Sequence, residues 1–191
     1  MINIKSKYID IEDENINCIV EYPVINTIKN DLFINYVNNL ISEDIKIFKD
    51  IIEENAISSN EKLTIFTDYK IQLNENNIVS LSIVFSEIYN YDSVINYVNT
   101  YNYDFNKNRQ ILIEDIFKKN FNYELLIQNE INTTPHKIIN EQSFYITPKY
   151  IAITFSSYEI TDDKDIVEIK LYFKEITDYL SDYTKQYIME Y

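Results

Sequence analysis

The chain has 191 residues, of which 46% are hydrophobic and none is glycine. Without glycine it cannot form phosphate-cradling loops, dinucleotide fingerprints or nucleophile elbows, which need positive φ or a close approach of the backbone. The 17 basic and 31 acidic residues give a formal net charge of −14, which repels nucleic acid and anionic membranes and attracts a cationic protein or a divalent cation. The same charge also keeps an aromatic-rich surface in solution, so it identifies no partner by itself.

The first 60 residues predict two strands followed by a long helix. Residues 2–11 and 15–23 are expected to be strands joined by an acidic turn. A helix is predicted from Asn30, a candidate N-cap, to residues 54–60. One face of this helix is expected to lie across a sheet, because its apolar residues recur at steps of three and four. These residues are Phe33, Val37, Leu40, Ile41, Ile45, Phe48 and Ile52.

The next segments predict the sheet. Apolar and polar residues alternate over 63–73, 79–86 and 94–105, which is the period of a β-strand. Asparagine clusters at 74–77 and 106–108 are expected to form the turns, since Asn is the ordinary residue that best tolerates left-handed backbone. Because the links are short, the three strands are expected to form an antiparallel meander.

The rest of the chain predicts short helices and further strands. Helices are expected at 111–119 and 122–132, strands at 144–147, 150–158 and 166–173, and a terminal helix or pair of turns at 176–191. Strand runs separated by helical blocks, without regular βαβ alternation, indicate an α+β fold. We expect one module over 1–191, with an N-terminal half at 1–90 that holds the long helix and the hairpin, and a C-terminal half at 91–191.

No catalytic residue, metal ligand or cofactor is predicted. Cys18 lies in an apolar run and is expected to be buried, and the single histidine, His136, is expected in a surface loop. The acidic stretches at 10–14 and 162–165 lack the ligand spacing of a calcium loop, so we interpret both as solvated turns. A pair of carboxylates acting on glycans stays open, because their separation in space cannot be read from a sequence.

Tyrosines gather around the third predicted strand and are the candidate ligand-binding residues. Exposed tyrosine offers a large contact area together with a hydroxyl group for hydrogen bonding. Alternatively, the same residues form the core face of a strand, and the sequence leaves both interpretations open. The candidates are Tyr89, Tyr91, Tyr97, Tyr101 and Tyr103.

Several short aromatic motifs occur in an order that resembles a known bacterial domain. They are Tyr-Asn-Tyr-Asp-Phe at 101–105, Ile-Leu-Ile-Glu-Asp-Ile-Phe at 111–117, Phe-Tyr-Ile-Thr-Pro at 144–148 and Ser-Tyr-Glu-Ile at 157–160. Together they resemble the domain of unknown function in the extracellular part of the RsiV anti-sigma factor, a lysozyme sensor, and ahead of the catalytic domain in PdaC-type peptidoglycan deacetylases. The segment at 22–25 and the meander from residue 63 resemble the N-terminal half of the same pairing.

The resemblance implies a binding or sensing module without chemistry of its own. We therefore expect a non-enzymatic protein that binds a cationic, lysozyme-like protein or a peptidoglycan fragment. The alternatives are a glycan hydrolase with two carboxylates and an intracellular scaffold or immunity-type partner. The sequence shows no signal peptide and no apolar stretch of membrane-spanning length, so a cytoplasmic location is expected, and an extracytoplasmic one if a leader was removed or the family habit holds.

Overall fold

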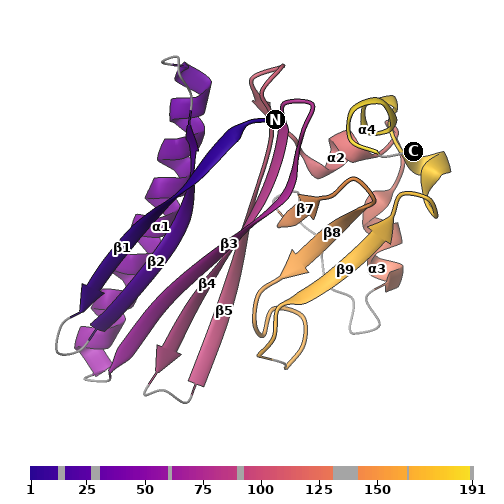
Figure 1. Ribbon diagram of the computed structural model, residues 1–191. Coiled ribbons are helices and arrows are strands. Elements are labelled where there is room, and N and C mark those ends of the chain that lie inside the picture. Colours follow the sequence, from indigo (N-terminus) through magenta and orange to yellow (C-terminus); the bar gives the residue numbers. More distant parts are fainter. Residues whose placement is uncertain are drawn as a thin grey trace. The chain divides into compact units, whose positions relative to one another are not determined.

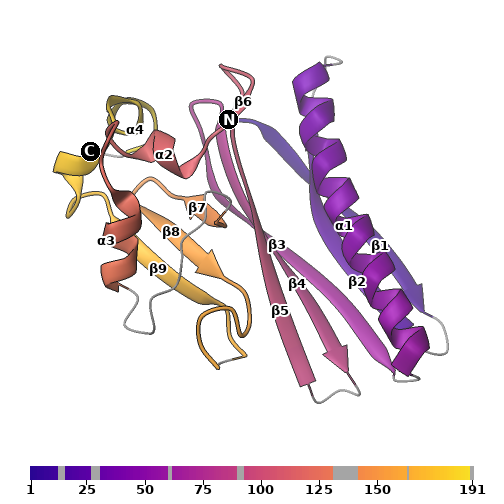
Figure 2. The ribbon, with the colours of Figure 1, turned by 180° about the vertical axis from the view of Figure 1, so that it is seen from behind.

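The fold is α+β, with a mostly antiparallel six-stranded sheet, a long helix and a separate three-stranded sheet (Figures 1 and 2). The structure, a computed structural model, describes residues 1–12, 16–26, 31–59, 62–89, 93–130, 142–162 and 164–189. The larger sheet has the order β1-β2-β3-β4-β5-β6 and the smaller one β7-β8-β9. The strands of the larger sheet are β1 (Asn3–Glu12), β2 (Ile16–Asn26), β3 (Leu63–Glu75), β4 (Ile78–Tyr89), β5 (Ser93–Asp104) and β6 (Arg109–Gln110).

The remaining elements are shorter, apart from the first helix. The helices are α1 (Leu32–Ser59), α2 (Ile113–Ile116), α3 (Tyr123–Glu130) and α4 (Asp182–Tyr187), with a 3₁₀ turn at Thr177–Tyr179. The strands of the smaller sheet are β7 (Phe144–Ile146), β8 (Tyr150–Phe155) and β9 (Val167–Tyr172). Within the described parts of the chain, no helix is long and apolar enough to cross a membrane.

The chain divides into two compact units. The N-terminal unit comprises Ile2–Lys70 and Ile83–Tyr97, and the C-terminal unit comprises Met1, Ile71–Ser82 and Val98–Tyr191. Strands β3, β4 and β5 contribute residues to both units. The expectation of a single module with halves that meet at residue 90 stays a prediction.

In the N-terminal unit, the apolar face of α1 is buried as predicted. Val37, Ile41 and Ile45 are fully buried, and Phe48 meets Phe85 of β4 edge to face with ring centres 5.0 Å apart. Asp31 caps the helix, since its Oδ1 accepts hydrogen bonds from two backbone N–H groups of the first turn. The predicted cap, Asn30, lies outside the described residues.

Helix α1 connects β2 to β3, and these two strands pair in parallel. Strand β1 pairs antiparallel with β2, and β2 pairs in parallel with β3, with Cys18 opposite Ile65. This connection is a βαβ crossover, which the long helix makes possible because it lets the chain return in the same direction, and the predicted α+β class is confirmed. Cys18 is buried as predicted, and burial raises the pKa of its thiol.

Asparagine makes the tight turns that glycine would normally make. Asn76 and Asn77, which join β3 to β4, have φ of 51° and 58°, the signature of a type I′ hairpin. Asn108 and Asn120 also have positive φ, and so does Tyr158. The turns predicted at 74–77 and 106–108 are confirmed.

The C-terminal unit has its own apolar core, into which β8 and the flanking segments point. Ile151, Ile153 and Phe155 of β8 are fully buried in one cluster with Ile113 and Ile116 of α2. The helix predicted at 111–119 is shorter than expected, the one predicted at 122–132 is seen over Tyr123–Glu130, where the described residues end, and β6 was not predicted. The residues after the second helix, including His136, lie outside the described residues.

Candidate functional site

The structure separates the five candidate tyrosines. Tyr101 and Tyr103 are only 5% and 4% exposed and lie in the C-terminal unit, whereas Tyr97 is 38% exposed in the N-terminal unit. Tyr89 is half-buried, and Tyr91 lies outside the described residues. Alternation along β5 places Tyr97, Tyr101 and Tyr103 on one face, as predicted. The burial of that face differs along the strand, because Tyr97 is partly exposed and the other two are buried. Their role in ligand binding stays a prediction.

Tyr89 and Tyr97 meet at a buried carboxylate. The Tyr97 hydroxyl donates to Glu87 at 2.6 Å and the Tyr89 hydroxyl donates to it at 3.1 Å. The Tyr97 ring packs edge to face against Phe48 of α1, with ring centres 6.0 Å apart. Burial and the hydrogen bond to Glu87 raise the pKa of Tyr97 well above its ordinary value. These contacts hold the ring against the helix.

The larger of the two cavities described in the C-terminal unit is a groove, which we call the α2–α4 groove. It has a volume of about 610 Å³ and is lined by residues of α2, the α2–α3 connection, the start of α3 and the start of α4. The lining residues are Glu114, Asp115, Phe117, Lys118, Lys119, Asn120, Phe121, Tyr123, Ser181 and Tyr183. They include carboxylates, ammonium groups, an amide and four aromatic rings.

Stacked rings form one side of the groove. Phe117 and Tyr123 stack with centres 5.4 Å apart and planes at 10°, and Phe121 stacks on Tyr179 at 4.4 Å. Phe117 is buried, while Phe121 and Tyr123 are half-buried and keep part of each ring accessible. The turn that brings these rings together passes through Asn120 in the left-handed conformation. Burial, followed by the nearby carboxylates Glu124 and Glu114, raises the pKa of Tyr123.

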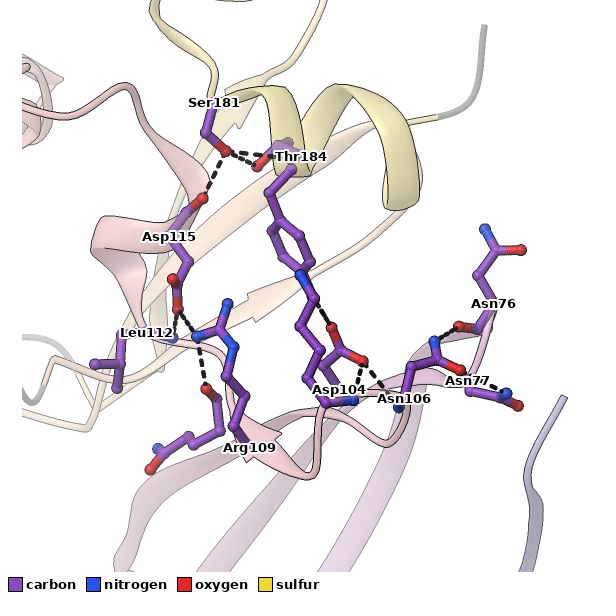
Figure 3. A network of polar contacts seen from close by, with 12 residues as sticks. Asn76, Asn77, Asp104, Asn106, Arg109, Leu112, Asp115, Ser181 and Thr184 are labelled. Atoms are coloured by element: carbon purple, nitrogen blue, oxygen red, sulfur yellow. Dashed lines mark hydrogen bonds and ion pairs between the residues drawn. The ribbon is translucent and has the colours of Figure 1, made fainter.

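Hydrogen bonds fix α2 beside α4 (Figure 3). The Asp115 carboxylate accepts from Arg109 at 2.7 Å and from the Leu112 backbone N–H at 2.8 Å. The Ser181 hydroxyl donates to the Asp115 carbonyl oxygen at 2.6 Å and also accepts from the Thr184 N–H, so it caps α4. The ion pair with Asp115 raises the pKa of the Arg109 guanidinium. Two segments far apart in sequence are thus held in register.

A buried aspartate fixes Tyr183 at the edge of the groove. The Tyr183 hydroxyl donates to Asp104 Oδ2 at 2.8 Å, while Asp104 Oδ1 accepts from the backbone N–H groups of Asn106 and Lys107. The Lys107 ammonium lies 4.2 Å from the centre of the Tyr183 ring, a cation–π contact. Burial and the bond to Asp104 raise the pKa of Tyr183 well above its ordinary value.

The groove offers groups for recognition, and most of its polar atoms are already fixed. Asp115, Ser181 and Tyr183 are bonded within the protein, whereas Glu114, Lys118 and Lys119 are exposed. Among the described residues there is no group of three or more His, Cys, Asp and Glu side chains that could hold a metal ion. The arrangement is therefore suited to holding a ligand between rings and charged side chains.

Sequence reasoning did not identify the groove. Its residues come from 114–123 and from 181–183, and only tertiary hydrogen bonds such as Ser181 to Asp115 bring these segments together. The motif at 111–117, used above for the resemblance, does contain Glu114, Asp115 and Phe117. That overlap was the one signal in the sequence that pointed to this region.

Comparisons with known proteins extend the description of the fold. No protein-family model and no curated protein matches the sequence. Two crystal structures of DUF3298 family proteins are similar over nearly their whole length. The first, from Bacteroides fragilis NCTC 9343, is 15% identical with a TM-score of 0.58, and the match covers 96% of this chain and 95% of that one. The second, from Pseudomonas aeruginosa PAO1, is 9% identical with a TM-score of 0.66 and covers 95% of both chains. This chain therefore has the fold seen in these two DUF3298 family structures.

Proposed function

We propose that the chain is a non-enzymatic binding module and that the α2–α4 groove binds a cell-envelope glycan. The observation that carries this proposal is the combination of partly accessible, stacked rings with exposed charged side chains in one groove. Phe121 and Tyr123 supply the rings, and Glu114, Lys118 and Lys119 supply the polar groups. A cavity of about 610 Å³ lies within the usual range of 300–1,000 Å³ for ligand sites.

The chemistry of the groove matches that of a sugar chain. A pyranose ring has an apolar face of C–H groups, which packs against an aromatic ring, and a rim of hydroxyl groups, which hydrogen-bond to charged and amide side chains. Tyrosine serves both needs because its ring is apolar and its tip is polar. The resemblance to domains of peptidoglycan deacetylases supports the same class of ligand.

A second candidate ligand, a cationic protein such as lysozyme, is favoured by a different surface. In the N-terminal unit, Asp10 of β1, Ile19 of β2 and Phe66 of β3 lie opposite one another in register, so their side chains share a face. All three are exposed, and Tyr8 and Glu21 form the next row of the same face. Exposed apolar side chains beside the carboxylates of Asp10 and Glu21 suit a partner with basic residues, as the net charge of −14 does.

The test is a calorimetric titration of the purified protein with soluble peptidoglycan fragments and, separately, with lysozyme at low salt. Binding of the fragments that Tyr123→Ala weakens about tenfold or more, and that Leu125→Ala leaves unchanged, would support the groove. Leu125 is a matched control because it is exposed on the same helix and does not line the groove. Lysozyme binding that Asp10→Lys abolishes would support the acidic face instead.

Chemical analysis of the same mixtures tests the non-enzymatic part of the proposal. Peptidoglycan fragments incubated with the protein should keep their length and their acetyl groups. Release of shorter sugars, abolished by Glu114→Gln without loss of the fold, would identify a hydrolase and overturn the proposal. If the titrations with peptidoglycan fragments and with lysozyme both gave no heat, the proposed binding function would be overturned as well.

A further inference from the structure

A second cavity in the C-terminal unit has a lining of a different chemical kind. It has a volume of about 320 Å³, and all of its polar side chains are uncharged amides and hydroxyls. We call it the amide pocket. Its lining residues are Thr100, Asn102, Gln110, Leu112, Ile113, Gln142, Ser143 and Phe144, and none of them lines the α2–α4 groove. The pocket can therefore bind a ligand group that the α2–α4 groove does not, and this inference goes beyond the proposed function.

The lining contains a buried amide with an unused oxygen. Gln142 is only 7% exposed, and its Nε2 donates to the Thr154 carbonyl oxygen at 2.8 Å. This bond fixes the orientation of the carboxamide, and no hydrogen bond to Oε1 is seen among the residues that the structure describes. An amide oxygen of a side chain that lines a cavity and is held in one orientation is a position to which a ligand can donate a hydrogen bond.

Thr100 supplies the matching donor. Its Oγ1 accepts from the Phe144 N–H at 3.0 Å, and its hydroxyl proton can be donated to a ligand. Asn102 holds the neighbouring backbone in place, because its Oδ1 accepts from Ser80 at 2.7 Å and its Nδ2 donates to the Phe144 carbonyl oxygen at 2.7 Å. One acceptor and one donor are thus presented by rigid supports, as in preorganised ligand sites.

Apolar residues complete the lining. Ile113 and Phe144 are buried, and Leu112 is partly exposed at the rim. With no charged side chain in the lining, a carboxylate or an ammonium group would lose its hydration without gaining a counter-ion, which disfavours its binding. The lining therefore suits a small neutral group that has one donor, one acceptor and a methyl-sized apolar part.

We propose that the amide pocket binds the N-acetyl group of a ligand. The N–H of the acetamide donates to Gln142 Oε1, its carbonyl oxygen accepts from the Thr100 hydroxyl, and its methyl group packs on Ile113, Leu112 and Phe144. Such a group occurs on N-acetylated sugars and on N-acetylated amino acids. The shared chemistry is the secondary acetamide, and the experiment below distinguishes the two sources.

The experiment is an NMR titration of the full-length, ¹⁵N-labelled protein with four small probes. N-acetylglucosamine is compared with glucosamine and with glucose, which lack the acetyl group, and with Nε-acetyl-lysine, which lacks the sugar. We expect saturable shifts of the Thr100 and Gln142 signals with N-acetylglucosamine, and binding at least tenfold weaker for glucosamine and glucose. Equal binding of acetyl-lysine would show that the acetamide alone is recognised, and weaker binding that the sugar ring contributes.

Two variants test the assignment of residues. Gln142→Leu removes the acceptor and is expected to weaken N-acetylglucosamine binding about tenfold or more. Gln128→Leu makes the same exchange on α3, outside both cavities, and should leave binding unchanged. Tyr123→Ala alters the groove and should also leave it unchanged, so failure of the groove and failure of the pocket are distinguishable. Saturable binding of glucose as tight as that of N-acetylglucosamine, or no saturable shift with N-acetylglucosamine, would overturn the proposal even if Gln142→Leu does not fold.

Discussion

Apolar packing and buried hydrogen bonds contribute in different proportions to the interior of each of the two units. In the N-terminal unit, the apolar stripe of α1 packs on the sheet, with Ile41 fully buried and Phe48 against Phe85. The C-terminal unit has an apolar core as well, but buried hydrogen bonds run through it, such as Ser80 to Asn102 and Thr184 to the Ile116 carbonyl oxygen. Directional bonds fix the position of backbone and side chains more narrowly than apolar contact does. Both cavities described above lie in the unit with the polar core.

The largest expected effect comes from the apolar packing of the N-terminal unit. Ile41→Ala removes a fully buried side chain and should lower the free energy of unfolding by about 2–5 kcal/mol. Ile47→Ala, on the exposed side of the same helix, should change it by less than about 0.5 kcal/mol. Urea denaturation followed by circular dichroism measures both. Equal losses for the two variants would contradict the packing of α1 described here.

In the C-terminal unit, the buried hydrogen bond between Ser80 and Asn102 should appear as a coupling energy between substitutions at these two residues. Asn102→Ala leaves the Ser80 hydroxyl and the Phe144 carbonyl oxygen without their partner, at a cost of about 1–3 kcal/mol for each buried group. Because Ser80 loses its acceptor in that variant, adding Ser80→Ala should cost less than Ser80→Ala costs alone. A double-mutant cycle by urea denaturation measures the coupling. Strict additivity would show that the Ser80–Asn102 bond contributes nothing to stability.

Alkaline pH probes one tyrosine in each unit. The pKa values of Tyr97 and Tyr183 are raised in the folded protein, first by burial and then by hydrogen bonds to Glu87 and Asp104. A folded-state pKa above the unfolded value of about 10 gives stability that is complete below pH 10 and is lost as the pH rises beyond it. We expect the free energy of unfolding to fall by about 1 kcal/mol or more between pH 9 and pH 11, a figure reduced for solvent screening at the partly exposed Tyr97.

Single variants assign that loss to a unit. Tyr97→Phe and Tyr183→Phe should each make the fall with pH shallower, because phenylalanine does not titrate. Tyr36→Phe, at an exposed position of α1, is the control and should leave the pH dependence unchanged. Urea midpoints at pH 8, 9, 10 and 11 give the slope for each variant. A slope that neither buried-site variant alters would refute this account of Tyr97 and Tyr183.

Much of the fold follows from local patterns. The three- and four-residue spacing of apolar residues predicted α1, strict alternation predicted β3, β4 and β5, and asparagine clusters predicted the hairpin at Asn76–Asn77. Each signal acts within a few residues, so a sequence displays it. The parallel pairing of β2 with β3 was not predicted, because it depends on where α1 carries the chain before β3 begins, and local patterns do not show that.

The candidate site was less predictable for the same reason. Alternation showed that Tyr97, Tyr101 and Tyr103 share a face, but burial depends on which element covers each position. Ser80 alternates with apolar residues along β4, yet it is fully buried, and its hydroxyl accepts from the Ile146 N–H and donates to the Asn102 amide oxygen. The α2–α4 groove and the amide pocket both combine residues from distant segments.

The smallest expected effect comes from one backbone position in the C-terminal unit, where a substitution should raise stability. Tyr158 has a φ of 62°, a left-handed conformation that costs a bulky residue about 1–2 kcal/mol. Asparagine tolerates this conformation better, so Tyr158→Asn should raise the free energy of unfolding by about 0.5 kcal/mol. Asn108 is exposed with a φ of 50°, so the reverse change, Asn108→Tyr, should lower it by a similar amount. Both shifts are measurable as urea midpoints. If Tyr158→Asn lowered stability, contacts of the tyrosine ring would outweigh the cost of its backbone conformation. This turn would then depend on side-chain packing, as the N-terminal unit does, and not on the backbone tolerance that the asparagine turns use.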